Sequence, residues 1–275
     1  MIELKGISKR FNAATVNETT VFDDFSFTVN DGDFISVVGS NGSGKTTLLN
    51  LIAGTTLPDS GRILLDGTDI TLQKEFRRAR RMSRVFQDPS KGVAGEMTIA
   101  ENMSLADNKG KPYGLSFGIS KKRLSYYREL LSSLGLGLEN KMDVKIGSLS
   151  GGQRQAVSLL MATMTPIDVL ILDEHTAALD PHTADVIMQF TDRIVKEKHL
   201  TAIMVTHNLR YAVDYGNRLV MMNDGQVILD RFGKEIEDTA IEDILHIFNE
   251  ISIESGNLIQ STPTTVVGVL FCRNL

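Results

Sequence analysis

The octapeptide GSNGSGKT, residues 39–46, constrains the fold of this chain more than any other stretch. It follows the apolar run FISVVG, residues 34–39, and leads into KTTLLNLIAG, residues 45–54, so we expect a buried strand, a glycine-rich loop and a helix in that order. Glycines allow the loop backbone to turn its N–H groups inward around phosphate oxygens, and the helix amino terminus adds a favourable dipole. The pattern G-x-x-x-x-G-K-[ST] in this context predicts a nucleotide site in which Lys45 reaches the β- and γ-phosphates and Thr46 places its hydroxyl on Mg²⁺.

A second apolar run ends in acidic residues and supplies the other half of such a site. The stretch VLILDE, residues 169–174, is typical of a buried strand, and Asp173 at its carboxyl end can hold the Mg²⁺ shell. Glu174 stands where a carboxylate could polarise an attacking water, although a helix-capping or solvated acid is the alternative at this point. Another buried strand, residues 201–207, ends at His207, and we expect it to lie parallel to the first.

A GTP-binding motif was weighed as an alternative. A GTPase would carry N-K-x-D after a late strand, and NKMD does occur at residues 140–143. The tetrapeptide follows LGLGLE, which is typical of a helix end rather than of a buried strand, so we interpret the match as coincidental. The sequence therefore favours ATP as the nucleotide.

The remaining segments indicate further subdomains around this core. Residues 2–11, 21–29 and 62–67 alternate as short strands do, and residues 91–160, with a strongly helical segment at 121–136, indicate an inserted helical subdomain. We also expect a helix over residues 183–198 and a hairpin over residues 218–230 that turns on Asn223, Asp224 and Gly225. The C-terminal tail, residues 249–275, has a composition that indicates a disordered or non-native end.

Charge and composition narrow the expected partners. The net charge of −5 and the pI near 5.6 argue against a general nucleic-acid binder, because phosphate backbones are held by clustered Lys and Arg. The basic run RRARRMSR, residues 77–84, is interpreted as a solvated face rather than as a phosphate-binding stripe. No stretch approaches the ~18 apolar residues needed to cross a bilayer, and the single cysteine, Cys272, excludes an intramolecular disulfide. We therefore expect a cytoplasmic protein that reaches the membrane through a partner.

Six motifs in a fixed order complete a family pattern: GSNGSGKT, VFQDP, LSGGQ, VLILDE, AALD and VTH. Together they resemble the ATPase subunit of an ATP-binding cassette (ABC) transporter over residues 1–248. The resemblance implies an α/β P-loop NTPase with a RecA-like parallel sheet core, an antiparallel β subdomain and an inserted α-helical subdomain. It further implies a motor subunit that couples ATP binding and hydrolysis, in a head-to-tail homodimer, to movement of integral membrane permease subunits.

The stretches GGQRQAVSLLMAT and DEHTAALDP narrow the resemblance to a smaller group. They are similar to ABC ATPases paired with binding proteins for aromatic amino acids or similar small solutes. We therefore expect an importer, a solute-binding protein as a further partner, and a peripheral location on the inner face of the cell membrane.

The resemblance also assigns roles to single residues. Phe11 matches the aromatic residue on which adenine stacks, Gln87 matches the glutamine that touches the metal or water site, and Asp180 matches the loop residue at the subunit interface. His207 matches the histidine that contacts the γ-phosphate, and Glu174 matches the catalytic carboxylate. The residues expected to bind ATP are Phe11, Gly39, Ser40, Asn41, Gly42, Ser43, Gly44, Lys45, Thr46, Thr47, Ser150, Gly151, Gly152, Gln153 and Asp180; those expected at Mg²⁺ are Thr46, Gln87 and Asp173; the catalytic residues are Glu174, His207 and Gln87.

The pentapeptide LSGGQ, residues 149–153, gives the chain a second glycine motif for one kind of ligand. In the family two cassettes pack head to tail, so the phosphate loop of one faces the LSGGQ of the other across one ATP. Ser150 and the N–H groups of Gly151 and Gly152 would then form a second anion-binding helix terminus. A plain helix capped by serine is the less favoured alternative for the pentapeptide alone.

Two departures from the family pattern leave the catalytic groups in place. His175 stands where a proline usually follows the glutamate, and Ala177 stands where serine is frequent. Two rival functions were weighed: a soluble ABC ATPase acting on DNA or ribosomes, and a degenerate cassette that binds ATP only as a structural partner. The first would need long heptad stretches or a second cassette. The intact phosphate loop and catalytic residues argue against the second.

Overall fold

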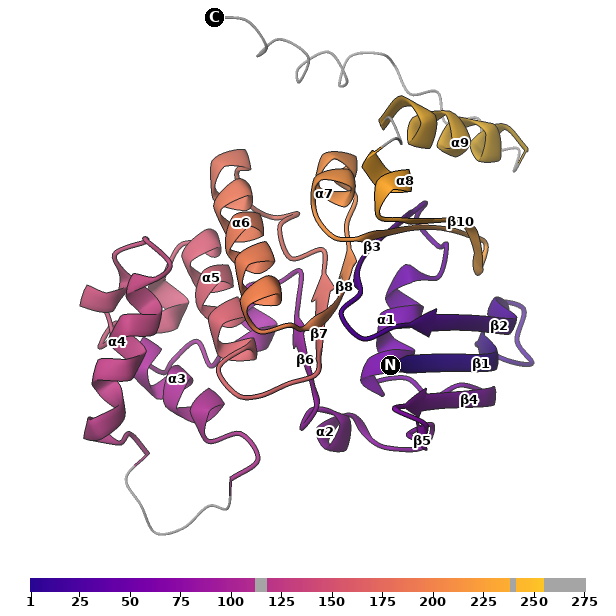
Figure 1. Cartoon of the computed structure of the whole chain (residues 1–275). Coiled ribbons are helices and arrows are strands. Elements are labelled where there is room, and N and C mark those ends of the chain that lie inside the picture. Colours follow the sequence, from indigo (N-terminus) through magenta and orange to yellow (C-terminus); the bar gives the residue numbers. More distant parts are fainter. Residues whose placement is uncertain (112–117, 238–240, 255–275) are drawn as a thin grey trace, which may run out of the picture. The chain divides into compact units, whose positions relative to one another are not determined.

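The computed structural model describes residues 1–111, 118–237 and 241–254, and it divides into two units, residues 1–238 and 239–275 (Figure 1). In the second unit the described part is helix α9, Ile241–Glu254. The predicted tail, residues 249–275, starts within this helix, and its residues 255–275 lie outside the described residues. Every predicted site residue belongs to the first unit. Among the helices that the structure describes, none combines the length and the apolar character needed to span a membrane.

A six-stranded sheet forms the centre of the first unit, in the order β10-β9-β3-β8-β7-β6. Neighbouring strands are parallel from β9 to β6, as predicted, whereas β10 pairs antiparallel with β9 in the predicted hairpin. The carboxyl ends of β3, β8, β7 and β6 therefore share one edge of the sheet, where ligands bind in open α/β sheets. The bounds are β3 Phe34–Gly39, β6 Met82–Val85, β7 Val169–Asp173, β8 Thr201–Val205, β9 Arg218–Asn223 and β10 Gln226–Phe232.

Side chains alternate between two apolar layers across this sheet. On β7, Leu170 and Leu172 join a buried cluster with the helical subdomain, whereas Val169 and Ile171 join a second cluster with α1 and the antiparallel sheet. Both faces of the sheet are thus covered, which explains why its central strands β3, β8 and β7 are largely apolar. The helices that flank it are α1 Lys45–Ala53, α6 Pro181–Glu197 and α7 Leu209–Asp214, with the short α8 at Lys234–Glu237.

The predicted antiparallel β subdomain is a four-stranded sheet in the order β2-β1-β4-β5. Its register is interrupted between Leu4 and Ile7, where Gly6 has a φ of 58° and a β-bulge bends the strand. Strand β2 begins two residues before the predicted start at residue 21, because Thr19 and Thr20 still pair with β1. The bounds are β1 Ile2–Phe11, β2 Thr19–Val29, β4 Ser60–Leu65 and β5 Thr68–Asp69, followed by α2 Glu75–Arg78.

The inserted segment is helical, and Figure 1 shows α3 and α4 gathered on the side of the first unit away from the antiparallel sheet. Asp107, at the end of α3, accepts hydrogen bonds from Tyr127 Oη at 3.0 Å and Arg123 Nε at 2.7 Å, which ties α3 to α4. The NKMD tetrapeptide follows a 3₁₀ turn in this segment rather than a strand of the sheet. The bounds are η1 Pro89–Gly92, α3 Ile99–Asp107, η2 Lys121–Arg123, α4 Leu124–Ser132, η3 Leu138–Asn140, η4 Ile146–Ser148 and α5 Gly151–Ala162.

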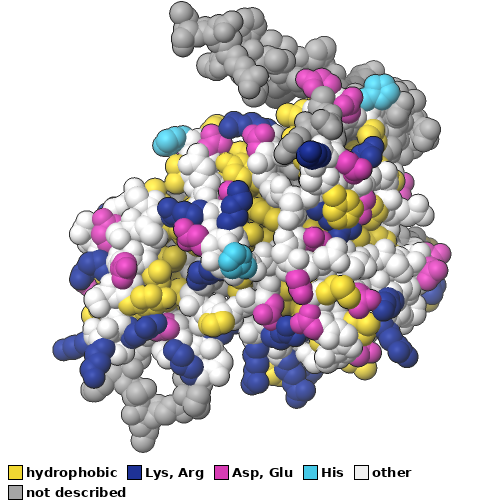
Figure 2. Space-filling view, in the orientation of Figure 1, with side chains coloured by type: hydrophobic (Ala, Val, Ile, Leu, Met, Phe, Trp, Pro, Cys, Tyr) yellow, Lys and Arg dark blue, Asp and Glu magenta, His cyan; other side chains and the backbone are white. Residues whose placement is uncertain are grey.

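The interpretation of residues 77–84 as one solvated face is wrong at two positions. Arg78 is 2% exposed, and its guanidinium is surrounded by backbone carbonyl groups. Arg84 lies on β6 with its side chain 11% exposed, because β6 starts inside the run and carries it into the sheet. Elsewhere the surface mixes charges: Figure 2 shows Lys and Arg side chains in small groups among Asp and Glu on the visible face.

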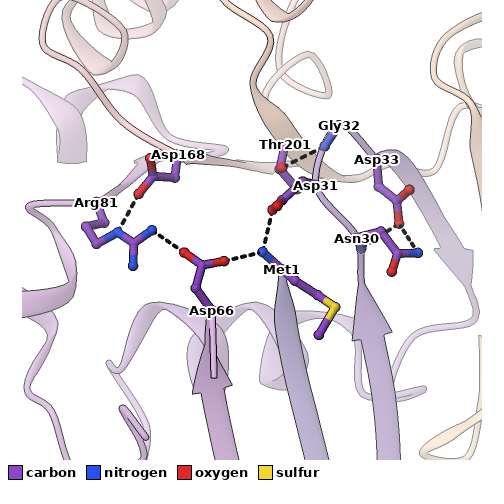
Figure 3. A network of polar contacts seen from close by, with 9 residues as sticks. All are labelled: Met1, Asn30, Asp31, Gly32, Asp33, Asp66, Arg81, Asp168 and Thr201. Atoms are coloured by element: carbon purple, nitrogen blue, oxygen red, sulfur yellow. Dashed lines mark hydrogen bonds and ion pairs between the residues drawn. The ribbon is translucent and has the colours of Figure 1, made fainter. Parts of the chain in front are cut away.

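A polar network ties the two sheets together at the amino ends of the parallel strands (Figure 3). Arg81 Nε contacts Asp168 at 2.5 Å, and its Nη2 contacts Asp66. Asp66 also accepts a hydrogen bond from the α-amino nitrogen of Met1 at 2.6 Å, and Asp31 is the other carboxylate partner of that nitrogen. The network lies at the opposite end of the strands from the phosphate loop, so it supports the fold away from the site.

Candidate active site

The phosphate loop holds the ammonium group of Lys45 against its own backbone. Lys45 Nζ donates to the carbonyl oxygens of Gly39 and Ser40, each at 2.8 Å, and to Ser43 Oγ at 3.4 Å, and the residue is 5% exposed. Burial lowers the pKa of Lys45, and the negative charge of Glu174 opposes that shift. The loop of β3 and the carboxylate that follows β7 are therefore electrostatic neighbours.

The amino terminus of α1 is open to an anion. Gly44, the residue before the helix, has a φ of 99° and offers no side-chain cap, and the first turn carries no acidic residue. Helices α2 and α4 also lack a side-chain cap, whereas α3, α5, α6 and α7 each have one. Free N–H groups at a helix start bind phosphate readily. Glycine is required at residue 39 for another reason, since a Cβ there would lie 2.2 Å from the carbonyl oxygen of Met222.

Asp173 and Thr46 offer oxygen atoms to a divalent cation. Asp173 ends β7 with its side chain 14% exposed, and its Oδ2 pairs with Arg84 Nη2 at 2.5 Å. Thr46 is exposed in the first turn of α1. Within the described ranges no group of three or more His, Cys, Asp or Glu residues could hold a metal by itself. Such a site fits Mg²⁺, which takes one or two protein oxygens and completes its shell with phosphate oxygens and water.

Glu174 and His207 form a pair at the same edge of the sheet. His207 Nε2 lies 2.8 Å from Glu174 Oε1, and their side chains are 47% and 16% exposed. Glu174 has a φ of 48°, which is costly for a residue with a Cβ, by about 1–3 kcal/mol. Its N–H donates to the carbonyl of Val205 at 3.0 Å, so β8 holds the turn in place. The turn therefore keeps Glu174 at the carboxyl edge of the sheet, beside His207.

Gln87 and Phe11 lie at the margins of the site. Gln87 is exposed just after β6, and the carbonyl of the preceding residue, Phe86, accepts a hydrogen bond from Gln155 Nε2 at 3.1 Å. Helix α5 therefore holds the segment that carries Gln87. Phe11 ends β1, is 38% exposed, and has Lys9 Nζ 5.3 Å from its ring centroid. The exposed part of this ring is available for stacking on a base.

Residues 149–153 form the start of α5, and part of the motif has a local explanation. Ser150 Oγ accepts from the N–H of Gln153 at 3.2 Å, and Gln153 Oε1 accepts from the N–H of Ser150 at 3.4 Å, which makes a capping box. A Cβ on Gly152 would lie 2.2 Å from Thr183 Cγ2, so glycine lets α5 pack on α6. A Cβ on Gly151 would meet only Leu179 Cδ2, at 3.9 Å.

The structure separates the two glycine motifs. In the part of the chain that it describes, no hydrogen bond or ion pair joins residues 150–153 to the phosphate-loop residues 39–47. Asp180 caps α6 by accepting from the N–H of Thr183 at 3.0 Å, next to Gly152 on α5. Residues 150–153 and Asp180 therefore form a second group, distinct from the phosphate loop, Asp173, Glu174 and His207.

Sequence reasoning missed three residues that support the site. The charge pattern predicts a solvated Arg84, the sequence analysis assigns no role to Gln155, and the family pattern marks His175 only as a departure. His175 is buried, its Nε2 lies 3.2 Å from Thr191 Oγ1, and burial lowers its pKa to about 4. The available signal for Gln155 was its place among the apolar residues of GGQRQAVSLLMA, since a polar side chain on a buried helix face needs a partner.

Comparisons with known proteins agree with this geometry. A family model described as "ABC transporter" matches residues 22–177. The chain is 46% identical over 248 residues to a "Tyrosine transport ATP-binding protein" of Clostridioides difficile (strain R20291), covering 90% of this chain and 98% of that protein. It is 31% identical over 227 residues to the "Methionine import ATP-binding protein MetN" of Corynebacterium efficiens, covering 82% of this chain and 61% of that protein.

Solved structures give the same result at the level of the fold. The chain superposes with a TM-score of 0.72, at 26% identity, on a dimeric ATP-binding cassette in a post-hydrolysis state bound to ADP and Pi, covering 84% of this chain and 98% of that one. A second cassette of an ABC transporter, in its ADP conformation, matches with a TM-score of 0.73 at 28% identity over 92% of this chain and 98% of that one. The chain therefore belongs to the ABC transporter family, as one of its ATP-hydrolysing cassettes.

Proposed function

We propose that this chain is the ATP-hydrolysing subunit of an importer for a small, amino acid-like solute, and that it works as a head-to-tail homodimer beneath permease subunits. One observation carries the proposal: the Lys45 loop, Asp173 and the Glu174–His207 pair meet at the shared carboxyl edge of β3, β7 and β8. This edge holds a cationic phosphate cradle and a strained carboxylate together, as nucleotide hydrolysis requires.

The residues divide the chemistry among themselves. The loop N–H groups and Lys45 bind the phosphate chain of ATP and balance its negative charge. Glu174 accepts a hydrogen bond from the attacking water and takes up its proton as the water oxygen bonds to the γ-phosphorus. The bond between that phosphorus and the β–γ bridging oxygen breaks in the same step, so ADP and phosphate are the products. His207, 2.8 Å from that carboxylate, orients it and donates to a γ-phosphate oxygen. Phe11 stacks on the adenine ring.

Mg²⁺ would be held by the Thr46 hydroxyl and Asp173, with Gln87 as a further oxygen ligand. When bound, it neutralises charge that develops on the β- and γ-phosphate oxygens. The hard oxygen atoms of these side chains suit this ion. The protein itself fixes Asp173 at the end of a buried strand, so that its carboxylate keeps a constant position at the carboxyl edge of the sheet.

The head-to-tail dimer gives residues 150–153 a role that the single chain leaves unused. Gly151 is exposed, and nothing within 3.9 Å of its Cβ position requires glycine. A partner's γ-phosphate approaching the amino terminus of α5 would meet the N–H groups there without a side chain in the way. Asp180, beside this helix start, would lie at the same subunit interface.

The proposals for the transported solute and for the partner proteins rest on the relatives of this chain rather than on the chemistry of its own side chains. The relatives described above are named for tyrosine transport and methionine import, which supports an amino acid-like solute and import. Permease subunits would hold the dimer at the inner face of the cell membrane, and a solute-binding protein would supply the substrate. A reading frame for a solute-binding protein beside one for a permease would support import, and an exporter-type fusion to membrane spans would contradict it.

The catalytic assignment is tested with Glu174→Gln. The amide cannot accept a proton from water, whereas the phosphate cradle is unchanged, so the variant should bind ATP, hydrolyse it very slowly and accumulate ATP-bound dimers. The matched control is Glu197→Gln, the same substitution at an exposed position on α6. Phosphate release by Glu174→Gln at the wild-type rate would refute the assignment of the base. A wild-type protein that binds ATP without releasing phosphate would favour the degenerate cassette.

The head-to-tail arrangement is tested with mixed dimers of one Lys45→Ala subunit and one Gly151→Asp subunit, with Glu174→Gln in both. Lys45→Ala weakens phosphate binding at its own loop, and Gly151→Asp places a carboxylate against the γ-phosphate that its helix start faces. If that helix start serves the partner's ATP, both lesions fall on one composite site and the other site retains one occluded ATP. Mixed dimers that retain none, while dimers with unaltered residues 150–153 and Lys45 retain two, would refute the arrangement.

A further inference from the structure

We propose that Arg84 is a positioning residue that serves as the resident counter-ion of Asp173 and weakens the hold of this carboxylate on Mg²⁺. The inference rests on the proposed function, which assigns Asp173 to the metal. It adds that Mg²⁺ must share the Asp173 carboxylate with the guanidinium of Arg84 or displace it. The metal affinity of the site is then set partly by strand β6, which contributes no residue to the phosphate loop.

The contacts of Arg84 place it between three parts of the site. Its Nη2 lies 2.5 Å from Asp173 Oδ2 at the end of β7, and its Nη1 donates to Asn50 Oδ1 of α1 at 2.7 Å. Arg84 precedes Gln87 by three residues, and its guanidinium carbon lies 4.9 Å from the ring centroid of Phe86. One cation therefore contacts the metal carboxylate, the helix of the phosphate loop and the segment that leads to Gln87.

Burial makes this pair stronger than a surface ion pair. The side chains of Arg84 and Asp173 are 11% and 14% exposed, so water screens them little. Arg84 binds Asp173 Oδ2, whereas no hydrogen bond or ion pair within the described residues engages Oδ1, which leaves that oxygen for a second cation. The carboxylate can thus bridge two positive groups.

A comparison with Arg78 argues against a purely structural role. Arg78 makes five hydrogen bonds through all three of its guanidinium nitrogens. Arg84 Nε is buried without a partner in the described part of the chain, so this guanidinium is held less completely. An arginine kept only for packing would be expected to satisfy its donors, because an unpaired buried N–H costs about 1–3 kcal/mol. A partly held guanidinium can instead shift when a second cation arrives.

The sign of the effect follows from charge. Removing Arg84 leaves Asp173 a nearly buried carboxylate without a counter-ion, so Asp173 repels the phosphate chain when no metal is present and attracts Mg²⁺ more strongly when it is. Both changes raise the ratio of nucleotide Kd without metal to nucleotide Kd with metal. We expect this ratio to rise about tenfold in Arg84→Met, the size of a typical coupling between two ligands.

The test measures this ratio by fluorescence of a MANT-labelled, non-hydrolysable ATP analogue, in EDTA and in saturating Mg²⁺; the chain contains no Trp to interfere. Arg84→Met should raise the ratio, and Arg84→Lys, which keeps the charge, should stay near wild type. Arg81→Met is the matched control, because it removes the same charge from the polar network at the other end of the strands. Arg84→Gln, which keeps donors without charge, gives the same test should Arg84→Met fail to fold.

The Asp173→Asn variant distinguishes a failure of the metal role assigned to Asp173 from a failure of the role assigned to Arg84. If Asp173→Asn leaves the ratio at its wild-type value, the metal role in the proposed function is wrong. If Asp173→Asn brings the ratio close to one while Arg84→Met leaves it within twofold of wild type or lowers it, the role of Arg84 is overturned. An equal rise in Arg81→Met would also overturn it, because the effect would then belong to net charge.

Discussion

Arg78 provides the sharpest test of how the phosphate-loop helix is held in the fold. Its Nη1 donates to the carbonyls of Leu51 and Ile52 at 2.7 and 2.9 Å, which are orphan acceptors in the last turn of α1. Its Nη2 donates to Ile70 and Thr71 at 2.7 and 3.0 Å, and the remaining bond, from Nε, also ends on a carbonyl. The side chain therefore joins the end of α1 to the segment after β5, and we predict that Arg78→Met destabilises the protein.

The magnitude follows from two opposing terms. Five hydrogen bonds from a charged group would contribute about 1.5–3 kcal/mol each if counted separately, which is an upper bound. Methionine relieves the desolvation of the cation, which amounts to several kcal/mol and lowers the pKa of Arg78 to about 10. The substitution leaves several buried carbonyl oxygens unpaired at about 1–3 kcal/mol each, so the net cost is about 3–5 kcal/mol once the relieved desolvation is subtracted. At about 2–4 °C per kcal/mol for a domain of this size, we expect a loss of roughly 10 °C in Tm.

The assays are thermal unfolding, which gives Tm, and unfolding in guanidinium chloride, which gives the free energy of unfolding, both followed by far-UV circular dichroism. Arg80→Met is the control, since it makes the same substitution two residues away on an exposed side chain. Arg78→Lys should recover little, because an ammonium group cannot reach carbonyls on several sides. Gly54, which ends α1 with a φ of 81°, gives a second check: a Cβ there would lie 2.7 Å from Arg78 Nε, so Gly54→Ala should also destabilise. Arg78→Met within 1 kcal/mol of wild type would refute the reasoning.

Further predictions concern α5, α6 and the buried imidazole. Burial lowers the pKa of His175 from 6.5 to about 4, so the neutral imidazole contributes to the free energy of unfolding fully above pH 6.5. This contribution is lost as the pH falls toward 4, by roughly 3 kcal/mol at most. His175→Gln should flatten this part of the pH dependence of the free energy of unfolding, and an unchanged slope would contradict the prediction. Gly152→Ala should cost about 1–3 kcal/mol in unfolding experiments, because its Cβ would overlap Thr183, and Gly152→Ala with Thr183→Ser should recover part of this. Gly151→Ala should stay within about 1 kcal/mol of wild type yet weaken ATP-dependent dimers in gel filtration; equal stability of the Gly151 and Gly152 variants would contradict the packing argument.

The sheet and its order of elements could be predicted from the sequence because burial on both faces leaves a strong signal. A strand covered on both sides is apolar along its buried length, as residues 169–172 are, and the turn at residue 39 needs glycine for steric reasons. The contact between Glu174 and His207 follows from the parallel order of their strands. Periodicity and turn chemistry are local properties, so they are readable without knowing the tertiary contacts.

Which arginines of the basic run, residues 77–84, are buried could not be predicted from the sequence in the same way. RRARRMSR holds one arginine buried among carbonyls, one in the polar network at the amino ends of the strands, and one beside the carboxylate of Asp173. Which of them is buried depends on where β6 begins and on which carbonyls and carboxylates lie opposite. Several of these partners, such as Leu51, Asp168 and Asp173, are 27 to 89 residues away in sequence, so composition alone indicates a solvated face.

Residues 149–153 show how a structure can divide a motif into local and intermolecular parts. Ser150 and Gln153 satisfy each other in a capping box, and Gly152 is required where α5 packs on α6. These three residues would be favoured in a chain that never met a partner. No packing contact requires glycine at residue 151. Glycine within a helix lowers the free energy of unfolding by about 0.5–1 kcal/mol relative to alanine. Under the proposed head-to-tail dimer, the requirement for glycine at this residue comes from the partner's nucleotide, which is why the mixed-dimer experiment places its charge there.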